Sequence, residues 1–376
     1  MSGIYIHVPF CRSKCAYCNF FSLVTEKKIN DFVTSLKREI VSRKNYLSGE
    51  KVETIYFGGG TPSLLPTNYV GEILEILNKN FDIVSKPEIT LEANPDTINR
   101  DQLLSLKRLG VNRISIGIQS FHDDDLKYLG RKHDSRHALQ IVDDLKSVDF
   151  DKLTLDLIYG IPTLTEEKWN KNLDIFFSTE ISHLSAYALT VEPKTILGQK
   201  IEKGDLQDVN EEKTIRHYEI LIEKTKENGF EHYEISNFAK EGFHSQHNSI
   251  YWKDVSYLGL GPSAHSYDRK SRQWNVANLT QYINTDFDTD TDFFEKEILT
   301  KNDKFNEYVM TSLRTSWGCD VEKIELDYGI SYKNHFLKNV KNYLDKGIML
   351  KNNNSYILTD NGMLLADGIA SEIFVD

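Results

Sequence analysis

Residues 4–18 read Ile-Tyr-Ile-His-Val-Pro-Phe-Cys-Arg-Ser-Lys-Cys-Ala-Tyr-Cys, an apolar run that leads directly into a loop with three cysteines. The apolar run is typical of a buried strand. Cys11, Cys15 and Cys18 have the spacing C-x3-C-x2-C, and no other two cysteines of the chain are close in sequence. Three thiolates of one short loop can bind three irons of a four-iron cluster, which leaves the fourth iron without a protein ligand. The loop therefore predicts a [4Fe-4S] cluster with one open iron.

Two other uses of these cysteines fit less well. A structural zinc ion normally takes four protein ligands, usually from two separated pairs, and the chain has no second pair. A disulfide pairing would leave one of the three cysteines over.

Composition limits the class of protein. The chain has 376 residues, of which 40% are hydrophobic, with 45 basic and 56 acidic side chains and a formal charge of −11. This length predicts two or three domains, or one large barrel with an appendage, and the charge argues against a polyanionic partner. Four cysteines suit a reducing compartment. With no signal or transit peptide and no long apolar run, we expect a cytoplasmic protein without a membrane span.

Strand and helix patterns alternate through the first half of the chain. After the first strand, predicted strands cover 54–57, 88–93, 113–118, 152–158 and 183–189, and predicted helices include 26–47, 101–109, 135–148 and 165–177. Six strand–helix units with strands apolar on both faces predict a parallel sheet with right-handed crossovers. We expect an α/β fold in which this sheet forms a partial (β/α)6 TIM-like barrel.

Polar and glycine residues gather late in the predicted strands. Gly58–Gly60, Glu92, Gln119, Asp156 and Tyr187 all lie at or near strand ends, as does the cysteine loop. Each of these residues alone has an ordinary structural explanation: a glycine can form a turn, and an acidic residue can cap a helix. Together they predict a site at the carboxyl-terminal rim of the barrel, where parallel barrels carry their sites.

The rest of the chain divides into two parts. We expect a barrel core over residues 1–200, a flanking segment over 201–290 and a C-terminal domain over 300–376. The last part combines short helices with a hairpin around Asn352–Asn354, a pattern similar to a winged-helix α+β domain. Because it carries more acidic than basic residues, we expect a scaffold or lid rather than a nucleic-acid-binding domain.

The cysteine loop, with Tyr17 before its last cysteine, resembles the radical S-adenosylmethionine (SAM) superfamily. Gly58-Gly59-Gly60-Thr61 after the second strand agrees with this resemblance, since glycine lets a ligand approach the backbone. The resemblance implies that SAM binds the open iron, and it implies the following SAM-contacting residues: Tyr5, Tyr17, Gly59, Gly60, Thr61, Glu92, Gln119, Arg131, Asp156 and Ala188.

Within the superfamily the chain resembles the branch of the oxygen-independent coproporphyrinogen III dehydrogenases and the related heme chaperones. Shared motifs include Glu-Ala-Asn-Pro at 92–95, Gly-Ile-Gln-Ser-Phe at 117–121 and Asp-Leu-Ile-Tyr-Gly-Ile-Pro at 156–162. The dehydrogenases usually carry a further cysteine where this chain has Phe20, and an N-terminal extension that is absent before Tyr5. Both departures favour a heme chaperone that delivers heme to a hemoprotein acceptor, which can be membrane-associated. Oxidative decarboxylation of coproporphyrinogen III to protoporphyrinogen IX stays the alternative.

The segment His247-Asn248-Ser249-Ile250-Tyr251-Trp252 resembles the H-N-x-x-Y-W motif linked to heme binding. An imidazole on an exposed segment is a suitable axial ligand of heme iron, so His247 is the predicted heme ligand. The opposing interpretation is a hydrogen-bonded surface histidine with Tyr251 and Trp252 in the core. His244 and His265 are nearby alternates.

Overall fold

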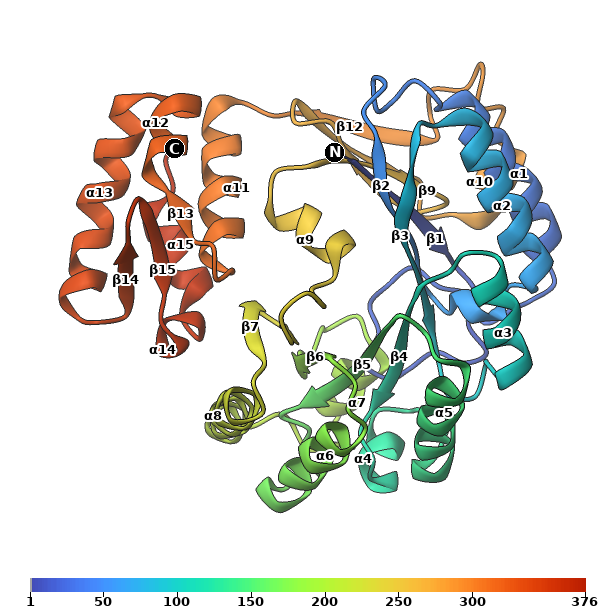
Figure 1. The fold of residues 1–376 in the computed structure, drawn as a ribbon, viewed down its shortest axis with the longest axis horizontal. Coiled ribbons are helices and arrows are strands. Elements are labelled where there is room, and N and C mark those ends of the chain that lie inside the picture. Colours follow the sequence, from blue (N-terminus) through green and yellow to red (C-terminus); the bar gives the residue numbers. More distant parts are fainter. Residues whose placement is uncertain (1) are drawn as a thin grey trace.

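The computed structural model describes residues 2–376, and its centre is an open barrel of six parallel strands (Figure 1). The strands are β1 (Ser2–Val8), β2 (Val52–Gly59), β3 (Ile83–Ala93), β4 (Arg113–Gln119), β5 (Lys152–Tyr159) and β6 (His183–Ala188). The helices between and after them are α1 (Ile29–Ser42), α2 (Thr67–Asn80), α3 (Arg100–Arg108), α4 (Asp123–Tyr128), α5 (Ser135–Val148), α6 (Glu166–Ser178) and α7 (Ile196–Glu202), with a 3-10 turn at Pro62–Leu64.

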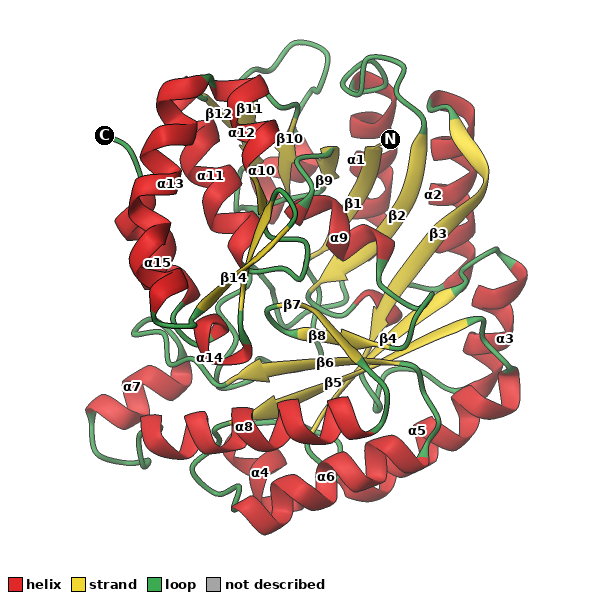
Figure 2. Ribbon diagram, turned by 60° about the vertical axis from the view of Figure 1, so that its left-hand side comes forward, coloured by secondary structure: helices red, strands yellow, loops and turns green. Residues whose placement is uncertain are grey.

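The six strands pair in chain order, each parallel to the next. In register, Ile4 lies opposite Ile55 and Leu91 opposite Ile114, and all four side chains are buried. Helices cover the outer face of the sheet, as Figure 2 shows. The expected α/β fold with a partial six-unit barrel is therefore confirmed, and all six expected strands are present.

Six further strands extend the sheet at both edges, giving the order β12-β11-β10-β9-β1-β2-β3-β4-β5-β6-β8-β7. The added elements are α8 (Glu211–Glu227), β7 (Glu231–Glu234), β8 (Asn237–Ala239), α9 (Gln246–Trp252), β9 (Ser256–Leu260), β10 (His265–Tyr267), β11 (Ser271–Asn275), α10 (Leu279–Asn284) and β12 (Phe294–Ile298). Helix α9 lies in the open side of the barrel (Figure 1). The sheet thus runs continuously from the barrel core into the flanking segment, and the division near residue 200 stays a prediction.

A buried carboxylate attaches the extension to the barrel. Glu39 on α1 is fully buried and accepts hydrogen bonds from the Gly261 amide (2.8 Å), Asn275 Nδ2 (2.7 Å) and the Tyr282 hydroxyl (2.6 Å). Arg43, one turn later, forms an ion pair with it at 3.4 Å. A buried charge is tolerated only when its oxygens are satisfied in this way, so α1 holds the β9–β11 extension in a defined position.

The C-terminal domain packs beside the open side of the barrel (Figure 1). It contains α11 (Lys301–Leu313), β13 (Cys319–Asp320), α12 (Val321–Tyr328), α13 (Ile330–Asp345), β14 (Met349–Asn352), β15 (Ser355–Leu358), α14 (Asp360–Met363) and α15 (Ala366–Ile373). Its strands form a small antiparallel sheet in the order β13-β15-β14. The expected helices and hairpin are present, with the short strand β13 added. Nowhere in residues 2–376 does a helix have the length and apolar character needed to cross a membrane.

Candidate cluster and cofactor site

The cysteine loop follows β1 at the carboxyl-terminal rim of the barrel and is tied to three other segments. The Cys11 amide donates to the Leu23 carbonyl at 3.0 Å. Ala16, between the second and third cysteines, donates to the Leu129 carbonyl (2.9 Å) and accepts from the Leu197 amide (2.7 Å). These backbone bonds cross the end of the loop, so the cysteines are held in place by the barrel rather than by the loop alone.

The three cysteines and nearly all predicted SAM residues line one cavity of about 490 Å³, called here the cluster cavity. Its lining includes Cys11, Cys15, Cys18, Tyr17, Gly59, Gly60, Thr61, Glu92, Gln119, Arg131, Asp156 and Ala188. Tyr5 is the exception, since it lines a neighbouring cavity instead. The structure therefore brings together residues spread from Cys11 to Ala188, as expected for a site at the carboxyl-terminal rim of the barrel.

The donor set of the cluster cavity fits an iron–sulfur cluster better than a single metal ion. All three cysteines are free and partly exposed. Among residues 2–376, no three His, Cys, Asp or Glu side chains are close enough to share one metal ion. A four-iron cluster places each thiolate on a different iron, so it does not require that closeness. Burial raises the pKa of the Cys18 thiol, and binding to iron would favour its thiolate.

Arg131 links the cluster cavity to the neighbouring strands, and it does so through Asn94. Its guanidinium donates to Asn94 Oδ1 (2.6 Å), to the Gly117 carbonyl (2.7 Å) and to Cys15 Sγ (3.3 Å). Asn94 in turn donates to Thr61 Oγ1 at 3.1 Å. Asn94 belongs to the Glu-Ala-Asn-Pro motif, in which the sequence indicates no role for it, but its contacts join two predicted SAM residues, Arg131 and Thr61.

Two glycines of this rim lie in close contact with neighbouring atoms. A Cβ on Gly60 would lie 2.6 Å from the Phe10 carbonyl oxygen and 3.1 Å from Cys11 Sγ. A Cβ on Gly117 would lie 2.7 Å from Gln119 Nε2 and 3.3 Å from an Arg131 nitrogen. The backbone beside Gly60 leaves no room for a side chain, whereas a side chain at Gly117 would displace the ends of the Gln119 and Arg131 side chains that line the cavity.

Gln119 ends β4 in a strained conformation. Its φ is +69°, in the left-handed region that non-glycine residues rarely adopt. The pairing of β4 with β5 shifts register between Gly117 and Gln119, so that Gln119 lies opposite Leu157. Strain of this kind is often found where a side chain is aimed into a site, and Gln119 lines the cluster cavity.

Two carboxyl groups, Glu92 and Asp156, face the cluster cavity with raised pKa values. Burial, together with the charge of Asp156, raises the pKa of Glu92 to about 7 although the Tyr56 hydroxyl donates to it at 2.7 Å. Burial likewise raises the pKa of Asp156 to about 7, against the lowering effect of Ser185 and Ser115. A cationic or hydrogen-bond-donating ligand would therefore stabilise the ionised form of both carboxyl groups.

These shifts predict a pH dependence of stability. Between about pH 4.5 and 7 the folded protein holds more protons on Glu92 and Asp156 than the unfolded chain does, so the contribution of these two groups to stability falls as pH rises. We expect Glu92→Gln to reduce this fall by about 1–3 kcal/mol, measured by urea unfolding of ligand-free protein at pH 5 and pH 7.5. Glu75→Gln, at an exposed residue of α2, is the control. The prediction is contradicted if the free energy of unfolding changes by the same amount between pH 5 and pH 7.5 in Glu92→Gln and in wild type.

His247 lies on α9, and its expected exposure is wrong. Only 1% of the residue is exposed. Its Nδ1 is hydrogen-bonded to Thr54 Oγ1 (2.8 Å) and its Nε2 to the Tyr251 hydroxyl (2.9 Å). The ring also stacks on Tyr56 with centroids 4.9 Å apart. Because α9 enters the open side of the barrel, this segment turns inward, a long-range effect that the local sequence does not reveal. Iron ligation by His247 stays a prediction.

The two alternate histidines lie apart from each other. His244 is hydrogen-bonded to Glu231 (2.9 Å) and stacks on Tyr233. His265, on β10, is exposed and lines the same neighbouring cavity as Tyr5.

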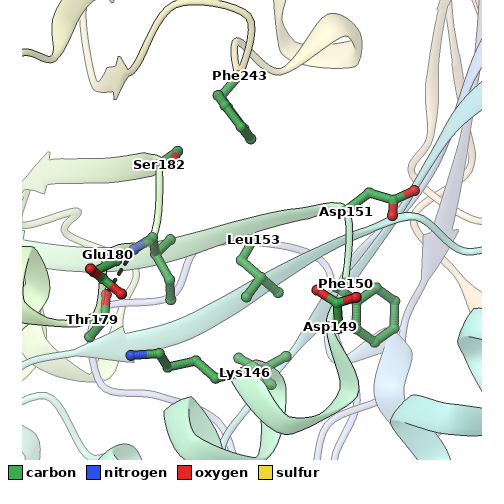
Figure 3. Close-up of a pocket in the computed structure, with 11 residues that line it drawn as sticks. Lys146, Asp149, Phe150, Asp151, Leu153, Thr179, Glu180, Ser182 and Phe243 are labelled. Carbon is green, nitrogen blue, oxygen red and sulfur yellow. Dashed lines mark hydrogen bonds between the residues drawn. The ribbon is translucent and has the colours of Figure 1, made fainter.

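Another cavity, of about 250 Å³, lies at the amino-terminal ends of β5 and β6 (Figure 3). Leu153 and Phe243 line it together with the charged residues Lys146, Asp149 and Glu180. It lies at the end of the barrel opposite the cysteine loop, where parallel barrels rarely carry sites. None of the predicted site residues lines it.

Comparison with known proteins agrees with this site. Residues 5–175 match the Radical SAM superfamily, and residues 299–365 match the HemN C-terminal domain. The chain is 31% identical to the heme chaperone HemW of Bacillus subtilis, with 98% of each chain covered. It is also 31% identical to the heme chaperone HemW of Lactococcus lactis, which covers 100% of this chain and 98% of the relative.

A solved structure shows the same fold. Escherichia coli coproporphyrinogen III oxidase (HemN), a radical SAM enzyme, superposes with a TM-score of 0.86 over 100% of this chain and 90% of that one. The identity is 24%, so this likeness concerns the fold alone. An open six-unit barrel with a three-cysteine loop at its rim defines a radical SAM protein. More narrowly, the chain belongs to the HemW family.

Proposed function

We propose that the protein binds a [4Fe-4S] cluster through Cys11, Cys15 and Cys18, with SAM beside it in the cluster cavity. The cluster, when bound, would supply an open iron for the amine and carboxylate of SAM and an electron for its cleavage. Arg131 can pair with a carboxylate, and the backbone of Gly59 and Gly60, which lines the cavity, can receive the methionine amine. Glu92 and Asp156 can accept hydrogen bonds from the ribose or the amine. Tyr17, Thr61, Gln119 and Ala188 complete the wall.

We further propose that the protein accepts heme and passes it to a hemoprotein acceptor. The observation that carries this proposal is the similarity over the whole length of both chains to proteins named heme chaperone HemW. Phe20 adds support, because the resembled dehydrogenases usually have a cysteine at this position. The free thiols suit a reducing compartment, so we place this function in the cytoplasm.

The second candidate is oxidative decarboxylation of coproporphyrinogen III. The fold shared with Escherichia coli HemN favours it, since the same barrel and C-terminal domain are present in both proteins. Fold alone does not define an activity, which depends on the residues of the site.

Two assays on the cluster-containing protein distinguish these functions. We expect titration with hemin to give a saturable Soret band at close to one heme per chain. We expect no protoporphyrinogen IX when the protein is incubated anaerobically with reductant, SAM and coproporphyrinogen III. Product formation at enzymatic rates would overturn the chaperone proposal, and so would the absence of saturable heme binding.

A further inference from the structure

A second cavity, of about 390 Å³, adjoins the cluster cavity and is called here the aromatic cavity. Its walls contain five aromatic side chains: Tyr5, Phe20, Phe21, Tyr251 and Tyr257. They come from β1, the cysteine loop, α9 and β9, segments that meet only because the sheet extension pairs β9 with β1. The volume lies within the range of about 300–1,000 Å³ typical of small-molecule sites, and an open, aromatic cavity suits a flat macrocycle whose polar edge stays in water.

The aromatic cavity and the cluster cavity share only the residues Asn19 and Phe20. Phe20 is 63% exposed, which is unusual for a side chain of this size. It therefore forms a partition between the two cavities rather than part of the core. A flat ligand in the aromatic cavity would cover this exposed ring.

Three imidazoles lie in or beside the aromatic cavity, and two of them have no free nitrogen. His7 shares one hydrogen bond with the Tyr5 hydroxyl (3.1 Å) and another with the Phe21 carbonyl (2.8 Å). His247 is bonded at both nitrogens, as described above, and is almost fully buried. Iron binding by either ring would require a hydrogen bond to break and a buried side chain to move out.

His265 differs from both. It is exposed, it lines the aromatic cavity, and within residues 2–376 its ring nitrogens have no hydrogen-bond partner. Its ring stacks on Trp274 of the neighbouring strand β11, with centroids 6.1 Å apart, which limits its rotation. Partial burial and the nearby Arg272 lower the pKa of His265, so the ring is neutral at neutral pH and keeps a lone pair for a metal.

We propose that the aromatic cavity is the heme seat and that His265, rather than His247, is the axial ligand of the heme iron. This inference rests on the proposed heme-binding function and specifies its site. The proposal requires the iron of heme, because a metal-free porphyrinogen has no metal for the free imidazole of His265 to bind. His247 then acts as a positioning residue: its hydrogen bond to the Tyr251 hydroxyl fixes that ring in the cavity wall.

The test compares heme spectra of wild type, His265→Ala and His247→Ala in the full-length protein. We expect His265→Ala to shift the Soret maximum and to lower heme affinity at least about tenfold. Mutation of residues that only orient metal ligands already lowers metal affinity by about 10–100-fold. We expect His247→Ala to keep the wild-type Soret maximum, whatever its affinity. His137→Ala, at an exposed histidine of α5, controls for adventitious binding to surface imidazoles.

Rescue by a small ligand separates iron ligation from a structural role. Added imidazole should restore the wild-type Soret maximum in His265→Ala, because it can occupy the vacated position on the iron. Circular dichroism and thermal unfolding check that the variant is folded, which we expect for a substitution at an exposed side chain. A wild-type spectrum in His265→Ala overturns this inference while leaving the heme function intact. Absence of heme binding by wild type overturns both.

Discussion

Replacement of Cys15 by alanine is expected to abolish the iron–sulfur chromophore of the reconstituted protein and leave the fold intact. Cys15 lines the cluster cavity and accepts a hydrogen bond from Arg131 Nη1 at 3.3 Å. Changes outside the ligand set already cost about 10–100-fold in metal affinity, so loss of a ligand should cost at least as much. Iron and sulfide analysis, with the visible absorption spectrum, measures the effect. Cys11→Ala and Cys18→Ala should behave in the same way.

The matched control is Cys319→Ala. Cys319 is fully buried in the C-terminal domain, and burial raises the pKa of its thiol, so the group stays protonated and packs as a small core residue. We expect this variant to retain the full iron content with a modest loss of stability. Retention of iron by Cys15→Ala, or its loss from Cys319→Ala, would contradict the assignment of the ligands.

The second large effect is expected from Arg113→Ala, which should reduce the free energy of unfolding by about 3–5 kcal/mol. Arg113 is 1% exposed and donates to Glu88 Oε2 at 3.2 Å and to Thr154 Oγ1 at 3.0 Å. It also donates to the carbonyls of Phe243 (2.7 Å) and His244 (3.0 Å). Removal of the guanidinium leaves the Phe243 and His244 carbonyls without this donor, and each unsatisfied buried group carries a desolvation cost. Of the cations paired with the buried Glu88 carboxylate, only Lys152 at 3.0 Å remains.

This network also holds α9 in the open side of the barrel. Glu88 Oε1 accepts the backbone amide of His247 at 3.1 Å, so Glu88 and Arg113 together anchor both sides of the helix N-terminus. We therefore expect hydrogen exchange of amides 245–252 to accelerate in Arg113→Ala. Urea unfolding and hydrogen exchange measure the two effects.

Arg136→Ala is the control for the loss of an arginine ion pair. Arg136 pairs with Asp134 on the surface, with 90% of its side chain exposed, and such pairs contribute at most about 1 kcal/mol. An equal change in stability for Arg113→Ala and Arg136→Ala would contradict the buried role of Arg113.

Much of the barrel could be predicted because its signals are local. Strand 152–159 reads Lys-Leu-Thr-Leu-Asp-Leu-Ile-Tyr and is rich in apolar residues, and helix α5 begins and ends at the expected residues 135 and 148. The edge strands could not be predicted as easily. Strand β12, for example, reads Phe-Glu-Lys-Glu-Ile and is largely exposed, so its sequence has no buried face to signal a strand. It is defined by its antiparallel pairing with β11.

The sequence by itself determined the chemistry available at the rim: three cysteines in one loop, and glycine and polar residues at the ends of successive parallel strands. Tertiary structure alone decided which histidine is accessible. His247 and His265 are both ordinary histidines in local sequence, but α9 turns the first into the barrel, where two hydrogen bonds hold it, and β10 leaves the second exposed beside an aromatic cavity. The physical reason is that accessibility depends on burial by distant segments, which local residue patterns do not encode.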